Sequence, residues 1–314
     1  MEMQDVLEMG RRLRNWGRWG PEDELGTLNF ITPGKMAQGC RLVKKGRAFA
    51  LAIPFDSQGP QAGFAGRINP VHVMLATGSD AAAGAQDLIP GGFRYADDLV
   101  TMPLQCATQW DSLAHVFYDG LMYNGYDCRL VTAYGAGRNS IDKMKDRIVS
   151  RGVLLDVPRY KGLDWLEPGY PITPEDLDGA AGRQRVAVEA GDILLVRTGH
   201  MALCRSRGTW EGFAGGDAPG LALSTAPWLH EKRVAAVATD TWGVEVRPNE
   251  PANSFQPLHM VLIRDMGLLL GEIFYLDELA EDCAADGTYE FLLVAPPIPF
   301  TGAVGSPVNP IALK

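Results

Sequence analysis

Residues 193–196 read Ile193-Leu194-Leu195-Val196, and Gly191-Asp192 precedes them while Arg197-Thr198 follows. The run is short and has no polar interruption, and the same holds for Val153-Leu154-Leu155. A strand with one face in water alternates apolar and polar residues, so unbroken runs indicate strands that are buried on both faces. The pattern predicts a sheet or barrel that helices cover on both sides.

Other segments fit this arrangement of strands and helices. Short apolar runs bounded by glycine, proline or aspartate predict strands at Ala48–Pro54, Val71–Thr77, Gly152–Val157, Asp192–Thr198, Val234–Asp240, Gly267–Phe274 and Tyr289–Pro296. Helices are predicted within 1–20, 32–42, 139–150, 173–179, 221–232 and 275–285. Two glycine- and proline-rich segments, 56–70 and 78–95, are predicted to be long surface loops. Loops of that length are more often functional than incidental.

The composition is that of a folded protein, with 314 residues, 46% hydrophobic and 21% charged. Twenty-nine basic residues against 38 acidic ones give a net charge of −9. No basic block is present, which disfavours nucleic acid and anionic membrane surfaces as partners. No boundary signal divides the chain, so we expect a single catalytic domain over 1–314, with 1–44 as an N-terminal helical arm.

Targeting signals and cysteine usage favour a cytoplasmic location. The N-terminus lacks a basic and apolar leader, and no apolar run reaches the roughly 20 residues of a membrane helix. The five cysteines are an odd number, widely spaced and without a CxxC pair, which is typical of a reducing compartment.

The strongest chemical signal is Gln105-Cys106-Ala107-Thr108-Gln109-Trp110-Asp111-Ser112-Leu113-Ala114-His115. It places two amides, a carboxylate and an imidazole close together, and His259 and Glu272 follow downstream. Aspartate, glutamate and histidine are donors for a divalent ion, although they also suit a buried Asp–His hydrogen bond without metal. HExxH, GxxxxGK[ST] and GxSxG motifs are absent, which argues against zincin, P-loop and serine-hydrolase chemistry.

This stretch resembles the metal-binding motif H-x-G-T-H-x-D-x-P-x-H of the cyclase family. That family includes bacterial kynurenine formamidase, isatin hydrolase and trans-dienelactone hydrolase. The positions that match are Thr108, Asp111 and His115. The departures are Gln105 and Gln109 in place of the first two histidines, Ala107 in place of glycine and Leu113 in place of proline.

The resemblance extends over roughly residues 45–300. Further family-like segments are Gly191-Asp192-Ile193-Leu194-Leu195, Arg197-Thr198-Gly199, Ala238-Thr239-Asp240, and His259 with Gly271-Glu272. The stretches 19–29 and 306–310 look like a longer branch of the family. The resemblance implies an α/β fold with a mixed β-sheet or flattened barrel core wrapped by helices. It also implies a homodimer or homotetramer.

The same resemblance implies a metal site. In the formamidase, one ion is held by two motif histidines and the aspartate, and a second by that aspartate, a later histidine and a glutamate. Here Asp111, His259 and Glu272 would complete the second site, while the first has lost both imidazoles. Amide oxygens are usually poorer zinc ligands, so we expect one divalent ion, Mn²⁺ or Zn²⁺. Gln109 and Gln105 would either ligate that ion or bind substrate.

The resemblance also assigns catalytic roles. His115 would transfer the proton, because imidazole can accept and return one at neutral pH, and Glu272 is the next candidate base. The aromatic residues expected to contact a ring-bearing small-molecule substrate are Trp110, Phe117, Tyr118, Tyr123 and Trp242. The same rings would equally suit an ordinary core.

The expected function is a metal-dependent hydrolase. It would use metal-activated water to open a C–N or C–O bond in a small cyclic amide, lactone or aryl amide. Two alternatives stay open: a catalytically silent small-molecule-binding protein on the same fold, and a metal-dependent lyase or dehydratase.

Overall fold

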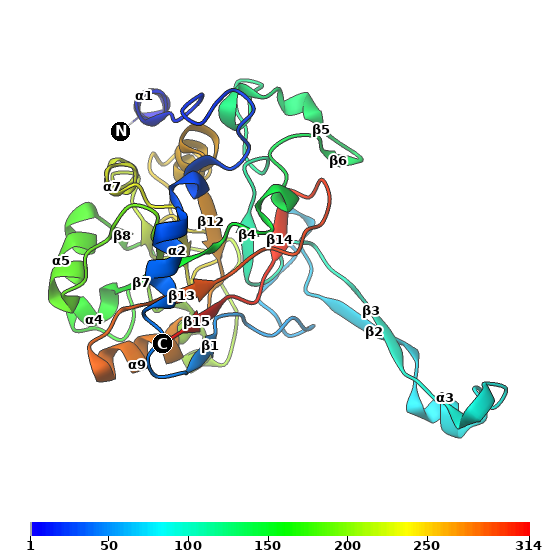
Figure 1. The fold of residues 1–314 in the computed structure, drawn as a ribbon. Helices are drawn as coiled ribbons and strands as arrows, with labels where there is room; N and C mark the ends of the chain where they lie inside the picture. The colour runs from blue at the N-terminus through cyan, green and yellow to red at the C-terminus, as the bar shows by residue number, and fades with distance from the viewer. Residues whose placement is uncertain (1) are drawn as a thin grey trace.

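A nine-stranded mixed sheet, curled into a half-barrel, forms the centre of the molecule, in a computed structural model that describes residues 2–314 (Figure 1). In spatial order its strands are β1 (Ala48–Ala50), β15 (Ile311–Leu313), β13 (Glu290–Val294), β7 (Val149–Asp156), β9 (Ile193–Arg197), β11 (Ala236–Thr239), β12 (Leu269–Glu272), β4 (Gln109–Asp111) and β14 (Gly305–Pro307). Strands β7, β9, β11 and β12 run parallel, and the outer strands join them antiparallel. The predicted α/β fold with a mixed sheet is confirmed.

The parallel strands are buried, as their unbroken apolar runs predict. Every residue of β9, β11 and β12 is buried, because the connections between parallel strands pass over the sheet faces. The helices in these connections and after β12 are α4 (Val157–Lys161), α5 (Pro174–Gln184), α6 (His200–Arg207), α7 (Thr225–Lys232), α8 (Pro257–His259), the π-helix η7 (Met260–Met266) and α9 (Asp277–Asp286). Within residues 2–314, none of the helices is long and apolar enough to cross a membrane.

The N-terminal helices, in the segment predicted as a helical arm, lie against the sheet and its helices. They are α1 (Met3–Leu13), η1 (Gly26–Phe30) and α2 (Pro33–Cys40). Helix α2 begins where the Thr32 hydroxyl accepts a hydrogen bond from the Lys35 amide, and it packs on β7 and β13. Helix α1 packs on η7, and Arg14 pairs with Asp265 at 2.8 Å.

The predicted helix at 139–150 is wrong. Only a short 3₁₀ turn forms, η6 (Ile141–Met144), and β7 begins at Val149. Ile141, Met144 and Ile148 have helical spacing and are all buried, but the Ile141 amide donates to the Ala303 carbonyl and leads the chain into the sheet. The remaining short elements are η2 (Phe64–Gly66), η3 (Pro90–Gly92), η4 (Tyr123–Gly125), η5 (Cys128–Leu130), β5 (Val131–Thr132), β6 (Gly135–Ala136), β8 (Pro171–Ile172) and β10 (Gly220–Leu221).

One hairpin projects away from the rest of the molecule (Figure 1). It consists of β2 (Val71–Ala76), β3 (Asp97–Thr101) and, near its tip, α3 (Gly78–Ala82); we call residues 71–101 the projecting hairpin. The strand predicted at Val71–Thr77 is present, but β2 and β3 are almost entirely exposed, with an ion pair between His72 and Asp98. The apolar residues of β2 therefore belong to no core formed by residues 2–314.

Candidate metal centre

The pairing of β4 with β12 places acidic and amide side chains together. Gln109 lies opposite Glu272, and the amide Nε2 of Gln109 donates to Glu272 Oε2 at 2.7 Å. Alternate residues of a strand point to the same side, so Asp111 shares the face of Gln109. All three side chains are buried.

Contacts made by Thr108 and at Gly271 hold β4 and β12 in their alignment. The Thr108 hydroxyl accepts from the Ile53 amide at 3.0 Å and donates to the Ile273 carbonyl at 2.6 Å. At Gly271, an added Cβ would lie only 2.7 Å from the ring of Trp110, so glycine lets that ring pack directly on the strand. These residues of the family-like motifs set the alignment of β4 and β12 behind the site.

A third acidic side chain, Glu245, holds His259 in place. Its carboxylate accepts hydrogen bonds from the amides of Leu258 and His259, at 3.0 and 2.9 Å, where the short helix α8 begins. It also bonds the His259 ring at Nδ1, 2.5 Å away. The other ring nitrogen, Nε2, lies 3.1 Å from Glu272 Oε1. A carboxylate at Nδ1 is the usual way to orient a histidine whose Nε2 faces a metal.

Burial and neighbouring charges shift two pKa values here. Burial by itself would lower the pKa of His259, but its bonds to Glu245 and Glu272 raise it to about 10. Burial raises the pKa of Asp111, and His115 opposes that rise. Because imidazole binds metal only when neutral, a metal at Nε2 of His259 would replace the proton shared with Glu272.

Asp111, His259 and Glu272 can hold a metal ion. Each offers one ligand atom, and these atoms lie within 4.8 Å of one another. Asp111 Oδ1 and Gln109 Oε1 are buried without a hydrogen-bond partner among residues 2–314. Unpaired buried oxygens are rare and costly, and two carboxylates with one imidazole suit a divalent cation. The residues present therefore fit the metal that the sequence predicts.

Gln105 lies beside this cluster. Its Nε2 is buried without a partner in the described chain and would be 2.4 Å from a Cβ at Gly305. Gly305 pairs with Asp111 across β14 and β4, so the Gln105 amide is close to Asp111.

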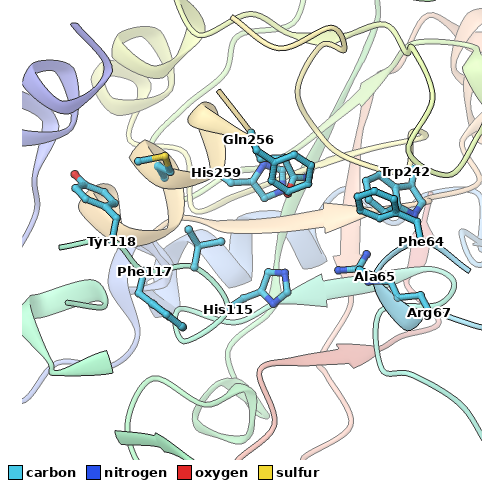
Figure 2. A pocket seen from close by; sticks show the side chains of 12 residues that line it. Phe64, Ala65, Arg67, His115, Phe117, Tyr118, Trp242, Gln256 and His259 are labelled. Atoms are coloured by element: carbon cyan, nitrogen blue, oxygen red, sulfur yellow. The ribbon is translucent and has the colours of Figure 1, made fainter. Parts of the chain in front are cut away.

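A cavity of about 370 Å³ opens beside His259, the member of the cluster that lines it (Figure 2). Both His115 and His259 line it, and His115 Nε2 lies 3.8 Å from Asp111 Oδ1. Phe117, Tyr118 and Trp242, three of the residues expected to contact substrate, also line the cavity.

Trp110 and Tyr123, which were predicted to contact substrate, lie outside the cavity. Both are fully buried in the core. The Trp110 indole donates to the Ala295 carbonyl at 2.9 Å, and the Tyr123 hydroxyl donates to Asp23 at 2.9 Å. Their polar atoms are thus paired away from the cavity.

Some residues of the site carry no assignment from the sequence. Glu245 follows the family-like segment Ala238-Thr239-Asp240 by a few residues, but its role depends on helix α8, which comes later in the chain. Phe64 and Arg67 line the cavity from the 56–70 loop, whose length is the one signal that could have drawn attention to them.

The chain matches a family model described as "Putative cyclase" over residues 49–246. A crystal structure described as a novel cyclase is 41% identical, with 97% of this chain and 99% of that chain covered and a TM-score of 0.88. No match was found among curated protein sequences.

More distant structures share the fold. Isatin hydrolase A from Labrenzia aggregata is 18% identical, with 85% of this chain and 93% of that chain covered and a TM-score of 0.61. A predicted metal-dependent hydrolase from Bacillus stearothermophilus is 16% identical, covers 85% and 97%, and has a TM-score of 0.53. The family model covers more than half of the chain and the 41% identical structure nearly all of it, so this chain belongs to the cyclase family.

Proposed function

We propose that this chain is a metal-dependent hydrolase that opens a C–N or C–O bond in a small cyclic amide, lactone or aryl amide. One observation carries the proposal. His259, one of the buried cluster of Asp111, His259 and Glu272, lines a cavity whose wall also holds His115, a histidine outside that cluster. Metal ligands and a separate proton carrier beside one cavity are the elements of metal-assisted hydrolysis.

The acidic residues and His259 would hold the ion. A Mn²⁺ or Zn²⁺ ion bound by Asp111, His259 and Glu272 would polarise a carbonyl and lower the pKa of a bound water. Glu245 keeps the His259 ring in position through Nδ1, and the Gln109 amide fixes one oxygen of Glu272. Those two contacts leave Nε2 of His259 and the other carboxylate oxygen of Glu272 facing each other, where an ion would bind.

His115 would move the proton. Its ring lines the cavity, and its 3.8 Å separation from Asp111 is too long for a hydrogen bond, so the ring is free to face substrate. It would take a proton from the attacking water and deliver it to the leaving nitrogen or oxygen. The rings of Phe64, Trp242 and Phe255 would exclude water around the substrate ring.

A relative's ligand agrees with an aromatic substrate. Isatin hydrolase A from Labrenzia aggregata was solved with benzyl benzoate bound, an ester flanked by two rings. The cavity of the present chain is also walled by rings, which supports a flat aromatic amide or lactone.

The glutamine pair favours one other function, a catalytically silent binding protein on the same fold. Gln105 and Gln109 replace two motif histidines, so the site has lost imidazole ligands. The proposed hydrolase needs one ion, and Asp111, His259 and Glu272 are enough to hold it.

The test combines metal analysis with product mass. Purified protein is dialysed, its metal content is measured, and it is incubated with isatin, formanilide and dihydrocoumarin. We expect about one divalent ion per chain. Isatin and dihydrocoumarin should each give a ring-opened product one water heavier, and formanilide should give aniline and formate. This activity should be lost with EDTA and regained with Mn²⁺ or Zn²⁺. Elimination of a small molecule without water uptake would indicate a lyase, and binding without turnover a silent binding protein.

The homodimer or homotetramer and the cytoplasmic location remain proposals. The projecting hairpin supports self-association, because its apolar side chains are exposed on both strands. Isolated two-stranded hairpins are marginally stable in water, so a covering partner would stabilise it. Light scattering of the purified chain measures the oligomeric mass.

A further inference from the structure

A closed loop, residues 61–69, carries one wall of the cavity. Its two ends are joined, because the Gln61 amide donates to Asn69 Oδ1 at 2.8 Å and Asn69 Nδ2 donates back to the Gln61 carbonyl at 3.2 Å. Gln61 Nε2 also donates to the Cys106 carbonyl at 2.8 Å, a few residues before β4. These bonds hold the loop beside the metal-binding cluster.

The loop brings an arginine among aromatic rings. Phe64 packs edge-on against Trp242 with centroids 5.4 Å apart, and it stacks on Phe255 at 6.2 Å. The guanidinium carbon of Arg67 lies 5.3 Å from the centroid of the Trp242 ring. Figure 2 shows the Arg67 side chain reaching into the cavity on the side of Trp242, toward His115. A flat ring bound here would have a guanidinium at its edge.

The charge of Arg67 has no partner in the described chain. Among residues 2–314, no carboxylate oxygen lies within 4.0 Å of its nitrogens, and the structure gives its side chain no hydrogen bond. Two other arginines that lie over aromatic rings are by contrast paired, Arg14 with Asp265 and Arg138 with Glu24. Arg67 is the one arginine or lysine lining this cavity within residues 2–314.

Arg67 also acts on the metal-binding cluster at longer range. Burial raises the pKa of Asp111, and the positive charge of Arg67 partly opposes that rise. The side chain is half-buried, so its charge is screened less than on an open surface. It therefore places a positive charge without an ion-pair partner beside the ring of Trp242, and that charge also acts on Asp111.

Resting on the proposed hydrolase function, we propose that Arg67 binds a carboxylate of the substrate. The substrate class is then an aromatic amide or lactone that carries a carboxylate on or beside its ring. A guanidinium offers two parallel N–H donors that match a carboxylate, and it keeps its charge under all relevant conditions. The aromatic wall would take the ring, and Arg67 would select for the anion.

The test uses a matched pair of ligands, 2-aminobenzoate and its uncharged isostere 2-aminobenzamide. Both are titrated into metal-depleted and Mn²⁺-loaded protein, with calorimetry as readout. The variant Arg67→Met removes the charge at similar length. The control Arg205→Met removes an arginine that stacks on Tyr275 outside this cavity and has no ion pair among the described residues.

We expect the wild-type protein to bind the carboxylate roughly 10- to 100-fold more tightly than the amide, as for hydrogen bonds to charged groups. Arg67→Met should abolish this preference and leave amide affinity and metal content unchanged, while Arg205→Met should keep the preference. Equal affinities in wild type overturn the proposal. So does a preference that survives Arg67→Met, or one that exists only with Mn²⁺, because the metal would then bind the carboxylate.

This inference and the proposed function fail separately. If the preference is present but no substrate is hydrolysed, Arg67 binds the anion in a protein that is not a hydrolase. If neutral amides and lactones are hydrolysed as well as their carboxylated analogues, the hydrolase stands and the role of Arg67 is wrong.

Discussion

The two sides of the candidate metal centre differ in how fully their polar atoms are paired. On one side, Glu245 accepts from two backbone amides and from the His259 ring, and that ring also contacts Glu272. On the other side, Asp111 Oδ1, Gln109 Oε1 and Gln105 Nε2 have no partner in the described chain. We call these the paired side and the unpaired side.

On the paired side the polar atoms form their hydrogen bonds when the chain folds, whereas on the unpaired side the oxygens await a bound ion. The paired side is already rigid, because each polar atom named there is bonded. A buried polar atom without a partner costs about 1–3 kcal/mol, so the unpaired side lowers the stability of the metal-free chain. A cation on that side would recover the cost of the two oxygens, Asp111 Oδ1 and Gln109 Oε1, on binding. The comparison can be tested by changing one side at a time.

The largest effect is expected from Asp111→Asn on the unpaired side. The variant should lose its bound metal after dialysis, because one of three ligands is weakened. Burial raises the pKa of Asp111, so its ionised form opposes folding above the ordinary aspartate pKa. The metal-free variant should therefore have a higher free energy of unfolding than the metal-free wild type at neutral pH, measured in urea.

Asp240→Asn is the matched control. Asp240 is also buried, but it accepts hydrogen bonds from the amides of Thr198 and Gly199. Burial raises the pKa of Asp240 as well, to about 6, but here the new amide group would face backbone donors. This variant should therefore be stabilised less than Asp111→Asn and should keep its metal. Normal metal stoichiometry in Asp111→Asn would remove Asp111 from the site.

His115→Ala should lower kcat roughly 10²- to 10⁴-fold, the usual contribution of a general acid–base residue. Metal content should stay at the wild-type value, because His115 is not one of the three residues whose ligand atoms lie together. Its Nε2 lies 3.8 Å from Asp111 Oδ1. Metal analysis and steady-state rates on the same preparation check both statements. Joint loss of metal and activity would make His115 a ligand instead.

Glu245→Ala tests the paired side. The change leaves two backbone amides and the His259 ring without their acceptor. Metal affinity should fall about 10- to 100-fold, the typical effect of removing a carboxylate that orients a ligating histidine. A competing chelator dye measures it. Glu245→Gln keeps a carbonyl acceptor and should lose less; an unchanged affinity in Glu245→Ala would mean that the paired side does not prepare the site.

The smallest effect is expected from restoring the two imidazoles, Gln105→His with Gln109→His. Imidazole binds borderline metals better than an amide oxygen does, so zinc affinity should rise roughly 3- to 10-fold. Alternatively, a second zinc ion should bind. Titration with Zn²⁺ measures both. If the folded double variant shows neither change, the two glutamines do not face the metal.

The three candidate metal ligands can be predicted from the sequence, but the residue that orients His259 cannot. Asp111, His259 and Glu272 are recognisable because their spacing matches a family motif, and the structure brings them together. Glu245 is not recognisable, because its role comes from a helix start that only the fold places against it.

The fold shows the same division. Strands β9 and β11 are predictable, since unbroken apolar runs have few stable arrangements outside a buried sheet. Strand β4 is not, because Gln109, Trp110 and Asp111 lack the pattern of a strand and are buried by the site itself. At 139–150, spacing typical of a helix is produced by a turn and a strand that bury the same residues.

The projecting hairpin gives the molecule a built-in kinetic reporter. Its backbone amides are protected only by the ladder between β2 and β3, whereas those of β9 lie inside the sheet. In a lone chain, deuterium should enter 71–76 and 97–101 long before it enters 193–197. If a second copy covers the hairpin, exchange there should slow as protein concentration rises while exchange in β9 stays constant. The exchange rate at this one segment would thus report self-association without an attached dye or tag.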